Sequence, residues 1–268
     1  MEILIDAFQY GFFIRAFVVG LALAVVYALL GNFVVLREEI VIGHTIANVV
    51  FLGVALSLLF SWNQSWVMVA SAILGVFFIL YLKKNSRFSQ NSVLEMTAQI
   101  AIATGIVVLA QLTGYRNITG FLFGNILAIS NSDVWLTSAV FLFNMVVLFL
   151  IRRPLTQLVI NRDLAIAAGN KVERINFIFL VLLALTVAAG IKIIGVVLLG
   201  AFLVIPANTA KNLAKSFRQM VGFSVGISLL AVIIGLFFSY LFDTPSGAMI
   251  VLILGVILVL TNLFRKII

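Results

Sequence analysis

The stretch LVINRDLAIAAGNKVERI, residues 158–175, decides the fold, because this polar, basic segment leads directly into apolar sequence of about two membrane lengths. That apolar sequence closes with GVVLLGAFLVIPANTA, residues 195–210. Within the polar segment, the pattern from Asp163 to Gly169 predicts a short helix that a glycine ends. Asn161 is a good N-cap residue, and Asp163 falls in the first turn, where the helix dipole favours an anion.

This short helix, near residues 161–170, has a small apolar face formed by Leu164, Ala165 and Ala168. A helix of this kind can lie across the membrane surface and fit a groove on a partner protein. The alternative is an ordinary connector helix at the membrane interface, and the residues by themselves leave both interpretations open.

Composition fixes the class of the protein. Hydrophobic residues make up 64% of the chain and charged residues only 10%, and apolar runs recur along all 268 positions. The runs are about 18 to 22 residues long, which is too long for the alternating strands of a barrel. We therefore predict an all-α, polytopic helical membrane protein with a single transmembrane domain over residues 1–268.

Hydropathy predicts about nine membrane spans. Their expected positions are residues 12–36, 40–60, 66–82, 93–113, 134–151, 175–190, 193–210, 220–241 and 246–264. The first of them follows MEILIDAFQYGFFIRAF, which lacks the cationic leader of a cleaved signal peptide, so we expect this span to be retained.

The loops between these spans alternate in charge. One side holds most of the 17 basic residues, namely Arg37, Lys83, Lys84, Arg87, Arg152, Arg153, Arg162, Lys171, Arg174, Lys211, Lys215, Arg218, Arg265 and Lys266. The other side holds Arg15, Arg116 and Lys192 together with Glu2, Asp6, Asp133 and Asp243. The positive-inside rule then predicts an amino terminus outside the cell and a carboxyl terminus in the cytoplasm. The net charge of +8 is accounted for by topology and does not indicate nucleic-acid binding.

Two kinds of chemistry are missing from the sequence. The chain has no cysteine, so neither disulfides nor thiolate metal sites are available. It also lacks the Gly-x-x-x-x-Gly-Lys-Ser/Thr phosphate loop, so it cannot bind ATP in that way. We expect no enzymatic activity in this chain.

Several of these features together resemble one family, the membrane permeases of bacterial ABC importers for zinc, manganese and iron. The family's cytoplasmic coupling helix has an acidic-x-Ala-x-x-x-Gly pattern, which Asp163, Ala165 and Gly169 match. Its Pro-Ala-x-x-Ala signature is matched by Pro206, Ala207 and Ala210. The stretches Leu122–Ala128 and Asp243–Ala248 match further motifs, and all of them occur in the family's order.

The resemblance implies a division of labour in the bacterial cytoplasmic membrane. ATP would be hydrolysed by a separate cytoplasmic subunit docked on the helix at 161–170. An extracytoplasmic binding protein would deliver the metal, because no external loop of this chain is large enough to capture it. A second permease, most simply another copy, would complete the membrane part. The divalent metal ion would be cargo, and we expect no permanently bound cofactor.

The family's second span commonly carries Gly-Asp-x-x-x-His-x-x-x-x-Gly, and the matching stretch here is Gly43–Gly53. His44 stands at the position of the family's Asp, and Asn48 stands at that of its His. Four residues apart, they share a helix face and could line a transient metal path. The alternative is that His44 is a hydrogen-bonded residue between helices with no contact to cargo.

Other polar residues point less clearly to a role. Glu95, Gln99 and Thr104 lie on the fourth span and could face the same path, although the position of Glu95 favours a solvated flank at the cytoplasmic end. Lys192 is expected to reach the outer headgroups from a tight turn at Gly190–Gly195. Pro206 is expected to kink its helix, with Asn208 and Thr209 helping to satisfy the freed backbone.

Three other functions fit the sequence less well. A secondary transporter or channel would need more ionisable residues at mid-span. An ABC permease for cobalamin, haem or a chelated metal usually has a longer chain. An intramembrane enzyme is suggested only by Gly222-Phe-Ser-Val-Gly226, whose Ser224 falls within a predicted helix and is better interpreted as part of a Gly-x-x-x-Gly packing face.

Overall fold

The computed structural model describes residues 9–85, 89–113, 115–125 and 129–265, and every regular element in these parts is a helix. The helices are α2 (Gly11–Leu36), α3 (Ile40–Leu59), α4 (Gln64–Asn85), α5 (Gln90–Thr113), α6 (Tyr115–Phe123), α7 (Asn131–Ile160), α8 (Arg162–Ala167), α9 (Val172–Ile194), α10 (Val196–Leu213), α11 (Phe217–Phe242) and α12 (Ser246–Arg265). Nine of these, all but α6 and α8, are long and apolar enough to cross a membrane, which confirms the predicted number of spans.

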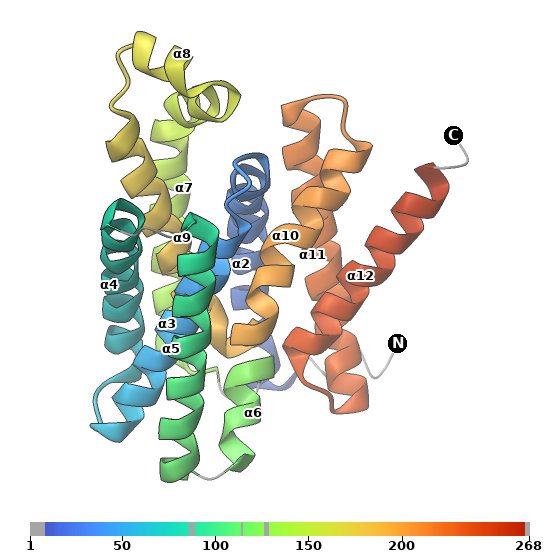
Figure 1. Cartoon of the computed structure of the whole chain (residues 1–268). Coiled ribbons are helices and arrows are strands. Elements are labelled where there is room, and N and C mark those ends of the chain that lie inside the picture. The colour runs from blue at the N-terminus through green and yellow to red at the C-terminus, as the bar shows by residue number, and fades with distance from the viewer. Residues whose placement is uncertain (1–8, 86–88, 114, 126–128, 266–268) are drawn as a thin grey trace.

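The spans are enclosed to very different degrees. In α9 and α3, about 70% of the apolar stretch is buried inside the chain (72% and 67%), whereas in α7 and α12 the value is 22%. Figure 1 shows α3 and α9 among the other helices, with α12 at the edge. The helix that carries His44 is therefore a central one, and α7 and α12 present apolar faces to lipid or to another protein.

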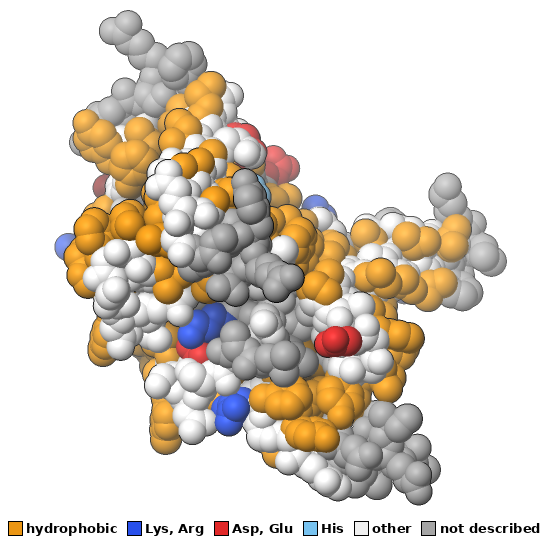
Figure 2. Space-filling view, turned by 90° about the horizontal axis from the view of Figure 1, so that it is seen from below, with side chains coloured by type: hydrophobic (Ala, Val, Ile, Leu, Met, Phe, Trp, Pro, Cys, Tyr) orange, Lys and Arg blue, Asp and Glu red, His pale blue; other side chains and the backbone are white. Residues whose placement is uncertain are grey.

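The two ends of the bundle differ. At one end, α8 projects beyond the spans on an extension of α7, and the α10–α11 connection lies on the same side (Figure 1). The short helix α6 lies at the opposite end. Figure 2 looks onto that opposite end and shows only scattered charged side chains among apolar and neutral ones on the described surface.

One helix extends beyond its predicted membrane span, and one predicted turn was wrong. Helix α7 does not stop before the basic pair Arg152 and Arg153 but continues through Pro154 to Ile160. Helix α9 continues through Gly190 and ends at Ile194, so the turn consists of Gly195, with φ +84°. Gly190 serves packing instead, because a Cβ there would lie 2.4 Å from Tyr27 Oη, which donates to the Thr186 carbonyl at 3.1 Å.

Candidate ion path and coupling surface

The predicted pair on the second span lies together as expected. Asn48 Nδ2 is 3.1 Å from His44 Nε2, one helical turn apart on α3. Asn48 is fully buried, and its Oδ1 has no hydrogen-bond partner among the described residues. A Cβ at Gly200 of α10 would lie 3.9 Å from His44 Nδ1, so the imidazole is turned toward α10. The pair therefore places a buried amide oxygen, without a partner among the described residues, beside an imidazole.

The short helix α8 forms as predicted. Asn161 Oδ1 accepts from the backbone N–H groups of Asp163 at 2.7 Å and Leu164 at 3.4 Å, so Asn161 is the N-cap. At the other end, the Gly169 N–H bonds the Ile166 carbonyl and the Asn170 N–H bonds that of Ala165, which is a Schellman motif. Gly169 has φ +78°, the conformation that this motif requires.

The exposed and buried faces of α8 differ from the predicted apolar face. Ala165 is completely buried, whereas Leu164 is 60% exposed and Ile166 is 53% exposed. Helices α7 and α9 contact α8. The small alanine thus lets α8 lie close against the chain, and the larger apolar side chains remain uncovered.

A polar joint connects the α2–α3 turn to α4 and α9 on the side of α8. Arg37 Nη2 lies 3.0 Å from Glu39 Oε2 and also donates to Asn176 Oδ1 of α9. The guanidinium carbon is 4.9 Å from the ring centre of Phe179, and Lys83 Nζ is 3.5 Å from Glu39 Oε1. We call these five residues the inner joint.

The inner joint is incompletely satisfied. Among the described residues, no group accepts a hydrogen bond from the buried Nη1 of Arg37. Burial lowers the pKa of the Arg37 guanidinium, and the neighbouring Glu39 carboxylate partly offsets that effect. A polar hollow of about 490 Å³ lies beside the joint and is also lined by Arg162 and Glu173. These contacts are made by long side chains that have room to rearrange.

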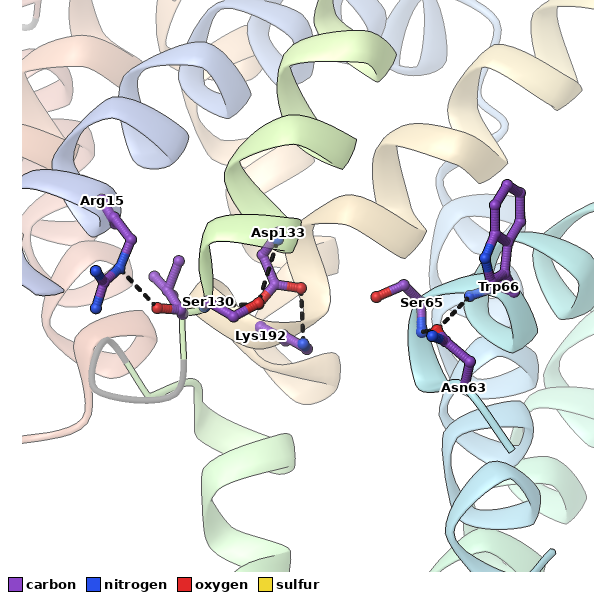
Figure 3. A network of polar contacts seen from close by, with 8 residues as sticks. Arg15, Asn63, Ser65, Trp66, Ser130, Asp133 and Lys192 are labelled. Atoms are coloured by element: carbon purple, nitrogen blue, oxygen red, sulfur yellow. Dashed lines mark hydrogen bonds and ion pairs between the residues drawn. The ribbon is translucent and has the colours of Figure 1, made fainter. Parts of the chain in front are cut away.

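At the opposite end, the prediction that Lys192 reaches the lipid headgroups was wrong. Its Nζ lies 2.7 Å from Asp133 Oδ1, and Asp133 Oδ2 accepts from the backbone N–H and hydroxyl of Ser130 (Figure 3). Nearby, Arg15 Nε donates to the Ile129 carbonyl at 3.0 Å (Figure 3). The ion pair therefore fastens the start of α7 to the end of α9.

Two stretches that matched family motifs meet at the α9–α10 turn. A Cβ at Gly124 would lie 2.0 Å from the Ile193 carbonyl oxygen, and one at Gly247 would lie 1.8 Å from that of Ile194. A Cβ at Gly195 would lie 2.4 Å from the Leu122 carbonyl oxygen. We call the three glycines and the Asp133–Lys192 pair the outer joint. The motif residues 126–128 lie outside the described residues.

Two other predictions concern residues within helices. Pro206 is buried inside α10, where its ring leaves the carbonyl of residue 202 without its usual donor. Thr209 Oγ1 donates to the Ile205 carbonyl at 2.8 Å, so it does not replace that donor.

Ser224 lies in α11 and accepts from Asn32 Nδ2 at 2.7 Å, as a structural residue would. A Cβ at Gly222 or Gly226 would meet no atom of the described residues within 4 Å, so these glycines form no packing face against that part of the chain.

Comparison with known proteins identifies the family. The model of the ABC 3 transport family matches residues 9–265. The chain is 29% identical over 252 residues to the high-affinity zinc uptake system membrane protein ZnuB of Haemophilus influenzae, covering 94% of this chain and 96% of that protein. It is 30% identical to the manganese import system permease protein ScaB of Streptococcus parasanguinis, covering 91% and 87%.

A solved structure agrees with these relatives. The chain is similar to PsaBC from Streptococcus pneumoniae in complex with a Fab, with a TM-score of 0.88, 26% identity, and coverage of 97% of this chain and 94% of that one. The predicted resemblance is thereby confirmed. The chain belongs to the ABC 3 transport family and is a membrane-spanning permease subunit, not the ATPase, of a metal-importing ABC transporter.

Proposed function

We propose that this permease moves a divalent metal ion, namely zinc, manganese or iron, into the cell by alternating access, driven by a separate cytoplasmic ATPase. The observation that carries the proposal is α8, a short helix capped at both ends that projects beyond the spans with Leu164 and Ile166 uncovered. An exposed apolar surface that projects beyond the spans is suited to bind a protein partner. The ATPase subunit is the partner that this transporter class supplies.

A continuous set of contacts supports transmission from α8 to the ion path. Helix α8 contacts α9, and Asn176 near the start of α9 accepts from Arg37. Arg37 pairs with Glu39, which is the N-cap residue of α3. His44 lies about one turn further along α3. A displacement of α8 would therefore be transmitted to His44 through the contacts of the inner joint.

The ion path would run beside His44 and Asn48. An imidazole nitrogen and an amide oxygen suit borderline divalent metals. In the described parts of the chain, no three His, Cys, Asp or Glu residues gather closely enough to hold a metal. Weak ligation suits a path, because a tight site would retain the ion.

The partners follow from the same scheme. The α8 side would be cytoplasmic, consistent with the basic residues of its loops, and this places the amino terminus outside and the carboxyl terminus inside. An extracytoplasmic binding protein would deliver the metal at the end that carries α6. A second copy of the permease would complete the path, and the chain would act as one transmembrane domain.

The coupling assignment is tested with Asp163→Asn in vesicles that contain the permease, its ATPase and its binding protein. The substitution removes the anion from the first turn of α8, where the helix dipole favours it. ATP hydrolysis should persist while metal uptake falls. Asp243→Asn, an equivalent change in an exposed residue at the other end of the bundle, should transport normally. Uptake by Asp163→Asn at the wild-type rate would exclude the assignment.

The path assignment is tested with His44→Ala in the same vesicles. Uptake should fall while the amount of assembled complex is unchanged, because the substitution removes a ligand from a half-buried position. Normal uptake by a well-assembled variant would leave His44 with a structural role only.

A further inference from the structure

The polar side of α5 is unusual for a membrane helix. Glu95 and Gln99 are exposed and lie one turn apart, and Gln99 Nε2 donates to Glu95 Oε1 at 2.8 Å. The buried side of α5 is formed instead by small and apolar residues such as Leu94, Ala98 and Ala101. A carboxylate within a membrane helix is costly against lipid and is found facing water or polar protein surfaces. The exposed Glu95 therefore faces water or a polar protein surface.

Contacts between α3 and α5 set the depth of Glu95. Thr45 Oγ1 donates to the Leu94 carbonyl at 3.1 Å, so residues 44 and 45 are level with residues 94 and 95. Further along, a Cβ at Gly105 would lie 2.8 Å from the ring of Phe51. The two helices therefore run in the same direction. The pair Glu95–Gln99 therefore lies at the same depth as the pair His44–Asn48.

An apolar hollow shows which side of α5 the pair occupies. The hollow, about 580 Å³ in volume, lies between α3, α4 and α5, and α5 contributes Thr97, Ile100 and Ala101 to it. At about 100° per residue, Glu95 and Gln99 point roughly 180° away from that hollow. His44 is likewise turned away from α4 and toward Gly200 of α10. His44 is thus on the α10 side of α3, and Glu95 and Gln99 are on the side of α5 that faces away from α4.

We propose that Glu95, oriented by Gln99, is the acidic residue of the ion path and receives the divalent cation next to His44 and Asn48. This inference rests on the proposed function. The carboxylate supplies the negative charge that the pair on α3 lacks, because imidazole and amide groups are neutral ligands. In a two-fold assembly each copy contributes one Glu95, so the charge at this level of the path is doubled without forming a closed metal site.

The transport test uses Glu95→Gln in vesicles with the complete importer and a limiting concentration of zinc, manganese or iron. Uptake should fall about tenfold, as is typical when a polar group that supports a metal site is removed. Glu95→Asp should retain part of the activity. Thr104→Val is the matched control, because Thr104 is exposed on the other side of α5 and its hydroxyl donates to the carbonyl of Ile100.

A second measurement separates a path residue from a structural one. The chain has no cysteine, so Gln99→Cys and Ile100→Cys each introduce a single thiol. A charged, membrane-impermeant methanethiosulfonate should label the first variant in the assembled complex and leave the second unlabelled. Failure to label Gln99→Cys would overturn the proposal, because its side of α5 would then be covered by lipid or protein.

The outcomes also distinguish this inference from the proposed function. Metal uptake by the wild type together with normal uptake by Glu95→Gln would overturn the role of Glu95 and leave the importer assignment intact. The fold reduction in metal uptake of the double variant His44→Ala with Glu95→Gln should be smaller than the product of the fold reductions of the two single variants, since both residues serve one path. A fold reduction in uptake equal to that product would contradict a shared path.

Discussion

The outer joint and the inner joint hold the bundle together in different ways. In the outer joint, backbone meets backbone at Gly124, Gly195 and Gly247, and the charge of Lys192 is paired with Asp133. In the inner joint, long side chains make the connections, one guanidinium nitrogen has no partner among the described residues, and a polar hollow lies beside them. Backbone contacts fix a geometry, whereas side-chain contacts can be remade. We infer that the inner end of the bundle is the end that adjusts when the ATPase acts.

The largest effect is expected from Gly247→Val. A Cβ at this position would lie 1.8 Å from the Ile194 carbonyl oxygen, which belongs to a helix end and cannot move aside. The free-energy cost should exceed about 3 kcal/mol, so little folded protein should be recovered. Gly222→Val, where a Cβ meets no atom within 4 Å, is the control and should give a normal yield of monodisperse protein. Equal yields would show that the outer joint is not closely packed.

The next largest effect is expected from Lys192→Met. This change leaves the buried Asp133 side chain, 8% exposed, without its cation and should destabilise the protein by about 3 kcal/mol. The double variant with Asp133→Asn removes both charges and should recover most of the loss. Thermal unfolding in detergent measures the stability of the single and the double variant. An equal loss in the single and double variants would mean that the charge pair contributes little beyond packing.

The smallest effect on stability is expected from Arg37→Gln in the inner joint. Glu39 keeps Lys83 as a partner, and the adjacent hollow can admit water, so the cost should be smaller than that of Lys192→Met. Transport should respond more strongly, with less metal moved per ATP hydrolysed, because Arg37 links α9 to the start of α3. A large loss of stability with unchanged transport would reverse the comparison between the joints.

Local features of the sequence predicted much of this structure. Runs of apolar residues located the nine spans because the bilayer demands length and hydropathy of each helix separately. The caps of α8 were also predictable, since Asn161 and Gly169 act on backbone groups only a few residues away. The His44–Asn48 contact follows from helical spacing in the same way.

The joints were not predictable, because they depend on contacts between distant residues. Lys192 and Asp133 are 59 positions apart, and nothing local to Lys192 distinguishes a paired lysine from one that reaches headgroups. Helix α6 was missed because nine residues of mixed polarity carry no membrane signal. The continuation of α7 to Ile160 was not predicted, because charge ends a membrane span but does not end a helix.

The central claim is that this chain conducts a divalent metal ion under the control of a separate ATPase. The most direct measurement is uptake of zinc, manganese and iron by vesicles that contain the permease, its ATPase and its binding protein, with and without ATP. We predict accumulation of one of these metals that requires ATP. Accumulation that is the same without ATP, or no metal uptake by a demonstrably assembled complex, would contradict the claim.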